Sequence, residues 1–308
     1  MKRFFEICLT LMFILIVGGC GSRATSNKYV DFRKTVPLPT TTTKPHDEHT
    51  LKVAIASVLL PQDTVTSYRA IAEYLGKKLD RPVMIIQKNS YSEIALLLLN
   101  GGADMAFFSS GGYANYIGVK GIELLASQQR MGLPFYQGYL LVLANSDIHS
   151  IEDLRGKTVA FTDPLSYSGH TFLVQELRKR GHTPENFLGH YIYTESHDAS
   201  FKALMNRVVD AVPVSRLVYD RAKVLNPHTA EKLRILAVSP PAGTGPVVAG
   251  KTLTTAEKEI LRKNLLSLDQ DPQMKQALNR LSIDKYVKSN QELFEPIRKA
   301  LLDNGEQP

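Results

Sequence analysis

Three stretches of this sequence place serine and glycine residues between an apolar run and a helical pattern. TDPLSYSGH (162–170) is one of them, and FFSSGGY (107–113) and TESHDA (194–199) are the others. A helix begins with four unbonded N–H groups and a partial positive charge. Small residues let an anion approach that backbone, and hydroxyl groups add donors, so each stretch suits an oxyanion. Taken singly, each serine could equally cap its own helix.

The three stretches are expected to converge. In parallel α/β topology the carboxyl ends of the strands lie at one edge of each sheet, and in a two-lobed protein those edges face a cleft. The residues expected around one anion there are Ser109, Ser110, Gly111, Ser166, Tyr167, Ser168, Gly169, His170 and His197. Their convergence favours binding over capping alone.

His197 is the most specific of these candidates. At a helix start an imidazole can donate a hydrogen bond to an anionic oxygen, and its charge can respond to that anion. The alternative is an ordinary surface or capping histidine. The other histidines of the domain show no i, i+4 pair or other ligand spacing, so we expect no metal and no cofactor.

The elements that must position these residues alternate between strands and helices. In the first part of the chain, apolar runs predict strands at 51–57, 81–87, 103–108 and 136–146, and apolar residues at helical spacing predict helices at 67–79 and 90–102. Asn100-Gly101 is a helix C-cap signature. The alternation indicates βαβ units and a mainly parallel sheet.

The pattern then restarts. We expect a short helix and strand within 150–163, a strand at 190–195, a helix at 196–207, a strand at 209–215, a helix at 216–225, two strands within 233–250, and helices at 255–268, 272–280 and 291–302. The sequence thus predicts two α/β lobes, 51–145 with 239–308 and 146–238. The chain would cross between them near 140–145 and 237–243.

The first twenty residues resemble an export signal. Lys2 and Arg3 precede an apolar stretch that is too short to span a membrane, and Gly18-Gly19-Cys20 follows it. A cysteine in this position resembles the lipobox of bacterial lipoproteins, so we expect lipid on Cys20; the alternative is an ordinary signal peptide. Residues 21–50 are polar and proline-rich, as in a flexible tether.

Charge and cysteine content narrow the classes of partner. The formal net charge of +7 over 308 residues suits an anionic ligand or an anionic membrane surface. The basic residues are dispersed and no aromatic-basic module occurs, which argues against nucleic acid. The only cysteines are Cys8 and Cys20, so the domain has no disulfide and no thiolate metal site.

The chain from about 51 to 302 resembles the phosphate/phosphite/phosphonate-binding proteins of bacterial ABC transporters. The resemblance lies in the order and spacing of five segments: SYRAIAEYLGKKLDRPV, GGADMAFFSSGGY, IEDLRGKTVAFTDPLSYSG, SHDASFKALMNRVVDAVPVSRLVYD and GPVVAGKTLTTAEKEILRKNLL. It implies an α/β, bilobal type II periplasmic-binding-protein fold whose lobes are joined by a two-strand hinge.

The resemblance also implies roles for particular residues. Tyr68 matches a first-lobe tyrosine that closes over the ligand, Ser109 to Tyr113 match a first-lobe helix start, and Ser166 to Gly169 match a phosphonate cradle. His197 matches a ligand-binding histidine, and Asp210 matches an acidic residue at a strand start facing the cleft. Two departures, Tyr167 in place of a threonine and Ser215 in place of an aspartate, leave the identity of the anion open.

The expected protein is therefore a monomeric, lipid-anchored, extracytoplasmic binding component of an ABC importer, with a permease and an ATPase as partners. Three alternatives stay open: a sensory module, the same fold with another small organic anion, and a serine hydrolase. The hydrolase is disfavoured because no Gly-x-Ser-x-Gly motif occurs.

Overall fold

The structure is a computed structural model that describes residues 49–56 and 61–305. These residues belong to one compact unit, Glu48–Pro308. The expected signal segment, the lipidation site Cys20 and nearly all of the expected tether lie outside the described residues. Within the described part of the chain, no helix combines the length and the apolarity that crossing a membrane requires.

The first lobe is built on a six-stranded sheet with the order β13-β4-β12-β3-β1-β2. Its strands are β1 (Leu51–Ala56), β2 (Val83–Lys88), β3 (Met105–Phe107), β4 (Glu123–Gln129), β12 (Pro246–Ala249) and β13 (Lys285–Val287). The central strand β1 pairs in parallel with β2 and with β3. Both faces of this strand are buried, with alternate residues in two separate core clusters, so helices must cover both sides of the sheet.

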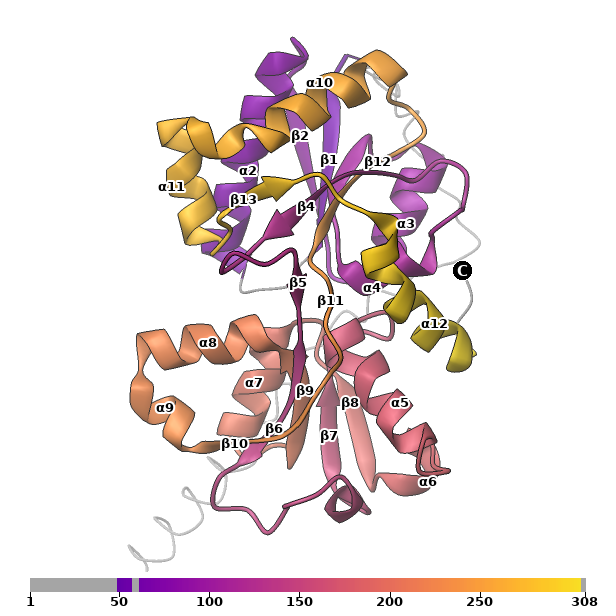
Figure 1. The fold of residues 1–308 in the computed structure, drawn as a ribbon, viewed down its shortest axis with the longest axis vertical. Coiled ribbons are helices and arrows are strands. Elements are labelled where there is room, and N and C mark those ends of the chain that lie inside the picture. Colours follow the sequence, from indigo (N-terminus) through magenta and orange to yellow (C-terminus); the bar gives the residue numbers. More distant parts are fainter. Residues whose placement is uncertain (1–48, 57–60, 306–308) are drawn as a thin grey trace, which may run out of the picture. The chain divides into compact units, whose positions relative to one another are not determined.

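Helices α2, α10 and α11 cover one face of that sheet, and α3, α4 and α12 cover the other (Figure 1). Their bounds are α2 (Pro61–Lys78), α3 (Tyr91–Asn100), α4 (Ser110–Asn115), α10 (Thr255–Leu266), α11 (Pro272–Arg280) and α12 (Glu295–Asp303), with 3₁₀ turns η3 (Leu268–Gln270) and η4 (Gln291–Phe294). Gly101 ends α3 with φ +79°, which confirms the predicted C-cap.

The second lobe is built on a five-stranded sheet with the order β10-β6-β9-β7-β8. Its strands are β6 (Gly138–Leu143), β7 (Thr158–Phe161), β8 (His190–Tyr193), β9 (Ala211–Ser215) and β10 (Leu233–Val238). The other elements are η1 (Glu152–Leu154), the π-helix η2 (Tyr167–Thr171), α5 (Phe172–Arg178), α6 (Pro184–Phe187), α7 (His197–Met205), α8 (Arg216–Leu225) and α9 (Pro227–Glu231). Helices again lie on both sides of the sheet (Figure 1).

Two short antiparallel strands join the lobes. These are β5 (Phe135–Tyr136) and β11 (Ala242–Gly243), and Tyr136 pairs with Ala242. The predicted boundary of the first crossing needs correction, because Gly138–Leu143 was assigned to the first lobe but pairs with β9 and β10 in the second sheet. Hydropathy marks this run as a strand, but it does not specify its partner.

The sheets are less parallel than the sequence predicts. Strands β6 and β12 run antiparallel to their neighbours in the two sheets. Each of them leads away from a hinge strand into its sheet, whereas β1, β3, β4, β7 and β9 run toward the hinge end. The carboxyl ends of these five strands therefore lie at the edges where the two lobes meet, as expected for a ligand-binding α/β protein.

Candidate ligand-binding site

A cavity of about 90 Å³ lies between the lobes and is lined by residues of both. One water molecule needs roughly 10–15 Å³ of cavity volume, so this cavity has room for a ligand with on the order of six to nine non-hydrogen atoms, if each needs about as much space as a water. The lining residues are Ala56, Thr64, Tyr68, Tyr91, Phe107, Phe108, Ser109, Ser110, Gly111, Gln128, Arg130, Tyr136, Ser166, Tyr167, His197, Ser215, Leu217, Thr244 and Gly245. Seven of the twelve residues predicted for the site are among them.

The first lobe contributes the start of α4. Ser109 is the N-cap, and its Oγ accepts a hydrogen bond from the Gly112 N–H at 2.9 Å. The backbone N–H groups of Ser110 and Gly111, in the first turn, have no partner within the helix itself. Capping and binding are thus compatible here, because the cap uses one donor of the turn and leaves others at the cavity wall.

The second lobe contributes three more helix starts. Ser166 caps η2 by accepting from the Gly169 N–H, Ser196 caps α7 by accepting from the Ala199 N–H, and Ser215 caps α8 by accepting from the Leu217 N–H. Ser166, His197 and Ser215 line the cavity. Their local sequences fold this way because a serine after a strand satisfies an N–H group that the helix leaves unbonded.

His197 stands at the first position of α7 and is 2% exposed. Its Nδ1 accepts a hydrogen bond from the backbone N–H of Ser215 at 3.2 Å and lies 3.2 Å from the Thr162 Oγ1. Burial lowers the pKa of this imidazole to about 4, so the ring is neutral at pH 7. A neutral ring that accepts at Nδ1 carries its proton on Nε2, where it is a donor.

A polar chain of three residues forms the opposite wall. Arg130 donates from Nε and Nη2 to Gln128 Oε1, at 3.1 and 2.7 Å, which leaves the amide nitrogen of Gln128 to donate to the Tyr68 hydroxyl at 3.2 Å. Because the Tyr68 oxygen accepts this bond, its own proton is available for another acceptor. Tyr68 lines the cavity.

The sequence patterns did not indicate Gln128 and Arg130 as site residues. They lie at the end of β4, a strand that was not predicted at all. The signal was present in IELLASQQR (122–130), an apolar run followed by polar residues, which is the same pattern that located the serine-rich turns.

Four predicted residues lie behind the cavity wall. The Tyr113 ring packs edge-on against Phe294 at 4.9 Å in the core of the first lobe. His170 packs against Phe161 at 4.8 Å, and burial lowers its pKa to about 4. A Cβ on Gly169 would lie 2.4 Å from the Thr162 Oγ1, so Gly169 serves close packing within the lobe. Ser168 is fully buried, beneath the Tyr136 hydroxyl.

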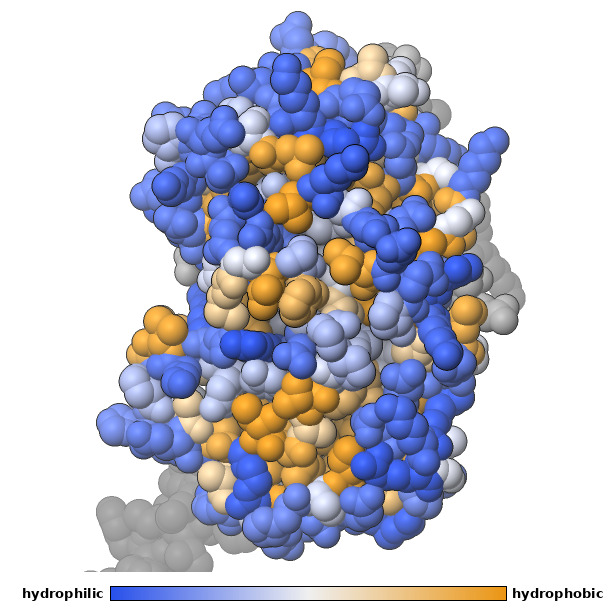
Figure 2. All heavy atoms as spheres, viewed as in Figure 1, coloured by the Kyte–Doolittle hydropathy of each residue, from blue (hydrophilic) through white to orange (hydrophobic). Residues whose placement is uncertain are grey.

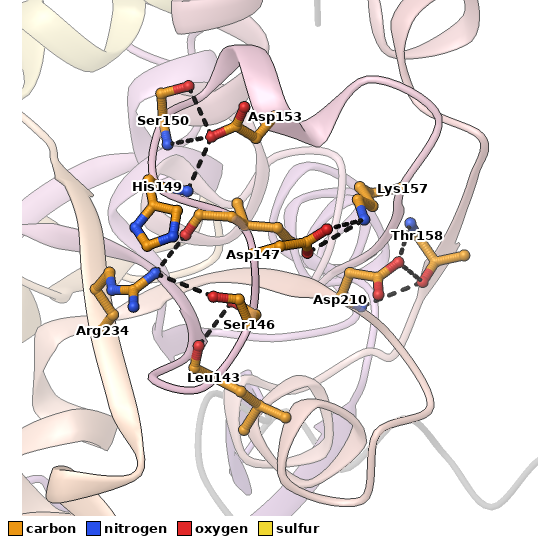
Figure 3. A network of polar contacts seen from close by, with 11 residues as sticks. Leu143, Ser146, Asp147, His149, Ser150, Asp153, Lys157, Thr158, Asp210 and Arg234 are labelled. Atoms are coloured by element: carbon orange, nitrogen blue, oxygen red, sulfur yellow. Dashed lines mark hydrogen bonds and ion pairs between the residues drawn. The ribbon is translucent and has the colours of Figure 1, made fainter.

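Asp210 does not face the cleft, which is where the resemblance placed it. Its carboxylate accepts hydrogen bonds from the Thr158 N–H and hydroxyl, both at 2.7 Å (Figure 3). Thr158 begins β7 and Asp210 immediately precedes β9, and these two strands are parallel. The amino ends of parallel strands lie at the edge opposite the cavity, so Asp210 fastens two strands together and does not face the cleft.

Direct contacts close the lobes around the cavity. The Tyr91 N–H of the first lobe donates to Asp163 Oδ2 of the second at 3.1 Å, and Asn89 donates to Glu195 at 2.8 Å. On the α12 side, Arg178 donates to the backbone carbonyl of Asn304 at 2.8 Å. A ligand in the cavity would therefore touch both lobes at once. Within the described residues, no cluster of three or more His, Cys, Asp or Glu side chains could hold a metal ion.

Two α/β lobes, a pair of hinge strands and a cavity lined by helix starts define a bilobal, type II periplasmic-binding-protein fold. The family model described as "ABC transporter, phosphonate, periplasmic substrate-binding protein" matches residues 53–294, and the chain belongs to this family. The family consists of transport components and not of enzymes, in agreement with the sequence analysis.

Individual relatives support the same placement. The chain is 28% identical over 184 residues to the phosphate-import protein PhnD of Mycolicibacterium smegmatis, and this match spans 56% of the chain and 57% of the relative's length. The structure of PhnD1 from Prochlorococcus marinus in complex with methylphosphonate matches with a TM-score of 0.75 and 18% identity, covering 84% of this chain and all of that one. A phosphonate-transporter binding protein from Pseudomonas aeruginosa matches with a TM-score of 0.76 and 21% identity, covering 84% and 87%.

Proposed function

We propose that this protein is the extracytoplasmic binding component of an ABC importer and that it captures a small phosphorus oxyanion, a phosphonate, phosphite or phosphate, between its two lobes. The single observation that carries the proposal is the convergence of helix starts from both lobes, with the Nε2–H donor of His197, on one small cavity. Tetrahedral oxyanions need several donors from different directions, and a site of backbone N–H and hydroxyl groups supplies them.

Binding and closure are coupled in this proposal. The cavity walls come from separate lobes, so an anion that bonds to both favours the arrangement in which they touch, by as much as its affinity differs between open and closed states. The permease and the ATPase would then receive the loaded protein. The lipid on Cys20 would hold it at the membrane, and residues 21–50 would give it reach; a monomer suffices for this cycle.

Specificity in this proposal follows from hydrogen-bond pairing. A fully paired oxyanion is accepted, whereas one with the wrong number of protons leaves buried donors or acceptors unpaired, at about 1–3 kcal/mol for each neutral group. Sulfate and sulfonates resemble their phosphorus counterparts in shape but differ in protonation, so they are the informative competitors.

Calorimetric titration of the purified protein with phosphate, phosphite, methylphosphonate, sulfate and methanesulfonate tests the proposal. We expect saturable binding of at least one phosphorus compound at one site per chain. Binding of a sulfur compound alone would move the protein to the alternative of another small anion, and binding of no phosphorus compound would refute the proposal.

A further inference from the structure

Arg130 is a half-buried cation at the cavity wall, and the proposed oxyanion contacts do not involve it. Besides its bonds to Gln128, it donates from Nη1 to the backbone carbonyls of Leu281 and Ser282. These four hydrogen bonds occupy four of the five N–H groups of a guanidinium and leave one on Nη2 for a further acceptor. No aspartate or glutamate among the described residues forms an ion pair with it within 4.0 Å. Arginine remains charged in this environment, although burial lowers its pKa.

The position of Arg130 relates it to one end of the ligand. Arg130, Tyr136 and Leu217 line the inner cavity and also a larger outer groove of about 270 Å³. The helix-start residues Ser110 and His197 line the inner cavity only. An oxyanion held at the helix starts therefore directs any substituent toward the end of the cavity where Arg130 lies.

The outer groove continues this end of the cavity toward the surface. It passes between the segment 130–137 and α8 and is rimmed by Arg216 and Arg221, with Asp220 as its one acidic residue among those the structure describes. Its apolar part includes Val224 and Leu225, which are 82% and 74% exposed at the end of α8. Figure 2 shows apolar surface where α8 meets α9 in Figure 1. The outer groove, which leads from the surface to the inner cavity, is therefore lined by basic and apolar side chains.

Neither Asp163 nor Asp284 lines the cavity beside Arg130. Asp163 accepts from the backbone N–H groups of Tyr91 and Leu165 at 3.1 and 2.8 Å and does not line the cavity. The negative charge of Asp284 raises the pKa of Arg130 from outside the cavity, and the Asp284 carboxylate accepts a hydrogen bond from the Gly132 N–H at 2.7 Å. Among the lining side chains that the structure describes there is no carboxylate.

We propose that Arg130 reads the substituent of the bound phosphorus oxyanion, and that the protein selects phosphonates whose substituent is neutral or carries a carboxylate over those that carry an ammonium group. This inference rests on the proposed function and refines it to a substrate class. A cationic substituent would be placed beside the half-buried guanidinium, where two like charges repel more than they do in open water because the cavity wall excludes part of the solvent. A carboxylate there would accept the remaining N–H of Nη2.

Three ligands of similar size separate these cases: ethylphosphonate, 2-aminoethylphosphonate and phosphonoacetate. At pH 7 their substituents are neutral, cationic and anionic. In calorimetric titrations of the full-length protein we expect 2-aminoethylphosphonate to bind at least tenfold more weakly than ethylphosphonate, and phosphonoacetate to bind at least as tightly as ethylphosphonate.

Variants then assign the selection to Arg130. Arg130→Gln is expected to bring 2-aminoethylphosphonate within about threefold of ethylphosphonate, whereas Arg130→Lys keeps the charge and therefore the parent's ranking. Arg221→Gln removes the same charge from the outer groove alone and serves as the matched control, expected to rank the ligands as the parent does.

Each outcome of these titrations supports or overturns the selection of the substituent by Arg130. Equal or tighter binding of 2-aminoethylphosphonate by the parent overturns the inference while leaving the proposed function intact. An unchanged ranking in Arg130→Gln assigns the selection to other groups and overturns it too. If Arg130→Gln unfolds, the ranking in the parent still tests the selection, and a ranking in Arg130→Lys that differs from the parent's overturns its assignment to the charge. Failure of all three ligands and of inorganic phosphate to bind would instead remove the proposed function itself.

Discussion

The backbone N–H of Ser215 donates to Nδ1 of His197 at 3.2 Å, which fixes the tautomer of this cavity-lining imidazole. Ser215 ends β9 and caps α8, while His197 begins α7, so the bond joins two helix starts of the second lobe. Its consequence is that the Nε2 proton, the only one on a neutral ring, remains available to an anion.

Replacing His197 by alanine should weaken ligand binding by roughly 1.5–3 kcal/mol, the usual worth of a hydrogen bond to a charged group. The same change leaves the buried Ser215 N–H without its acceptor, so the free energy of unfolding should also fall, by about 1–3 kcal/mol. Calorimetry and urea denaturation measure the two effects.

His190→Ala is the control for that variant, because His190 is an exposed residue at the start of β8 in the same lobe. It should leave both quantities unchanged. Undiminished ligand affinity in His197→Ala would reduce this histidine to a packing residue.

Gly111 lies where the two lobes approach each other closely. A Cβ added there would lie 1.8 Å from the backbone carbonyl oxygen of Leu165 in the other lobe. Gly111→Ala should therefore oppose closure and lower ligand affinity by about tenfold or more, with little change in unfolding, since overpacking of about 1–3 kcal/mol arises only when the lobes touch.

The neighbouring substitution Gly112→Ala separates this effect from misfolding. Its Cβ would meet the Phe108 ring at 2.6 Å, within the first lobe. It should lower the unfolding midpoint in urea, which Gly111→Ala should not. Loss of stability in both variants, with equal affinities, would contradict a closure role for Gly111.

Asp210→Ala should destabilise the second lobe without affecting the ligand. The variant loses two hydrogen bonds from Thr158 to a carboxylate, and we expect the free energy of unfolding to drop by roughly 1.5–3 kcal/mol. Asp147→Ala removes only an exposed ion pair with Lys157 at 3.4 Å and should cost less than about 1 kcal/mol (Figure 3). A loss of ligand affinity in Asp210→Ala would return this residue to the site.

The stability of the protein should fall as the pH is lowered from about 6.5 toward 4. Burial lowers the pKa of both His170 and His197 to about 4, whereas an unfolded histidine titrates near 6.5. In this interval the unfolded chain binds more protons, so each histidine contributes a slope of up to about 1.4 kcal/mol per pH unit, and its stabilisation is complete above 6.5.

Urea denaturation at several pH values between 7 and 4 measures this slope. His170→Gln should flatten it by one histidine's share without removing a cavity residue. Equal slopes in the parent and His170→Gln would contradict a buried neutral His170.

The sequence by itself determined most of the strands and helices and the positions of the serine-rich helix starts, because hydropathy period and capping residues act locally. The strand Leu51–Ala56, the C-cap at Gly101 and the caps Ser109 and Ser166 all follow from neighbouring residues. The family resemblance also held, since it depends on the order of such segments.

Only the tertiary structure decided which side chains reach the cavity. Ser166 and Ser168 stand two residues apart in one turn, yet one lines the cavity and the other is buried behind it. Asp210 and Ser215 bracket a single strand, and the direction of that strand sends them to opposite edges of the sheet. Arg130 enters the site because β4 pairs beside β12, a contact between residues more than a hundred positions apart. Strand order and direction are set by long-range packing, which no local pattern specifies.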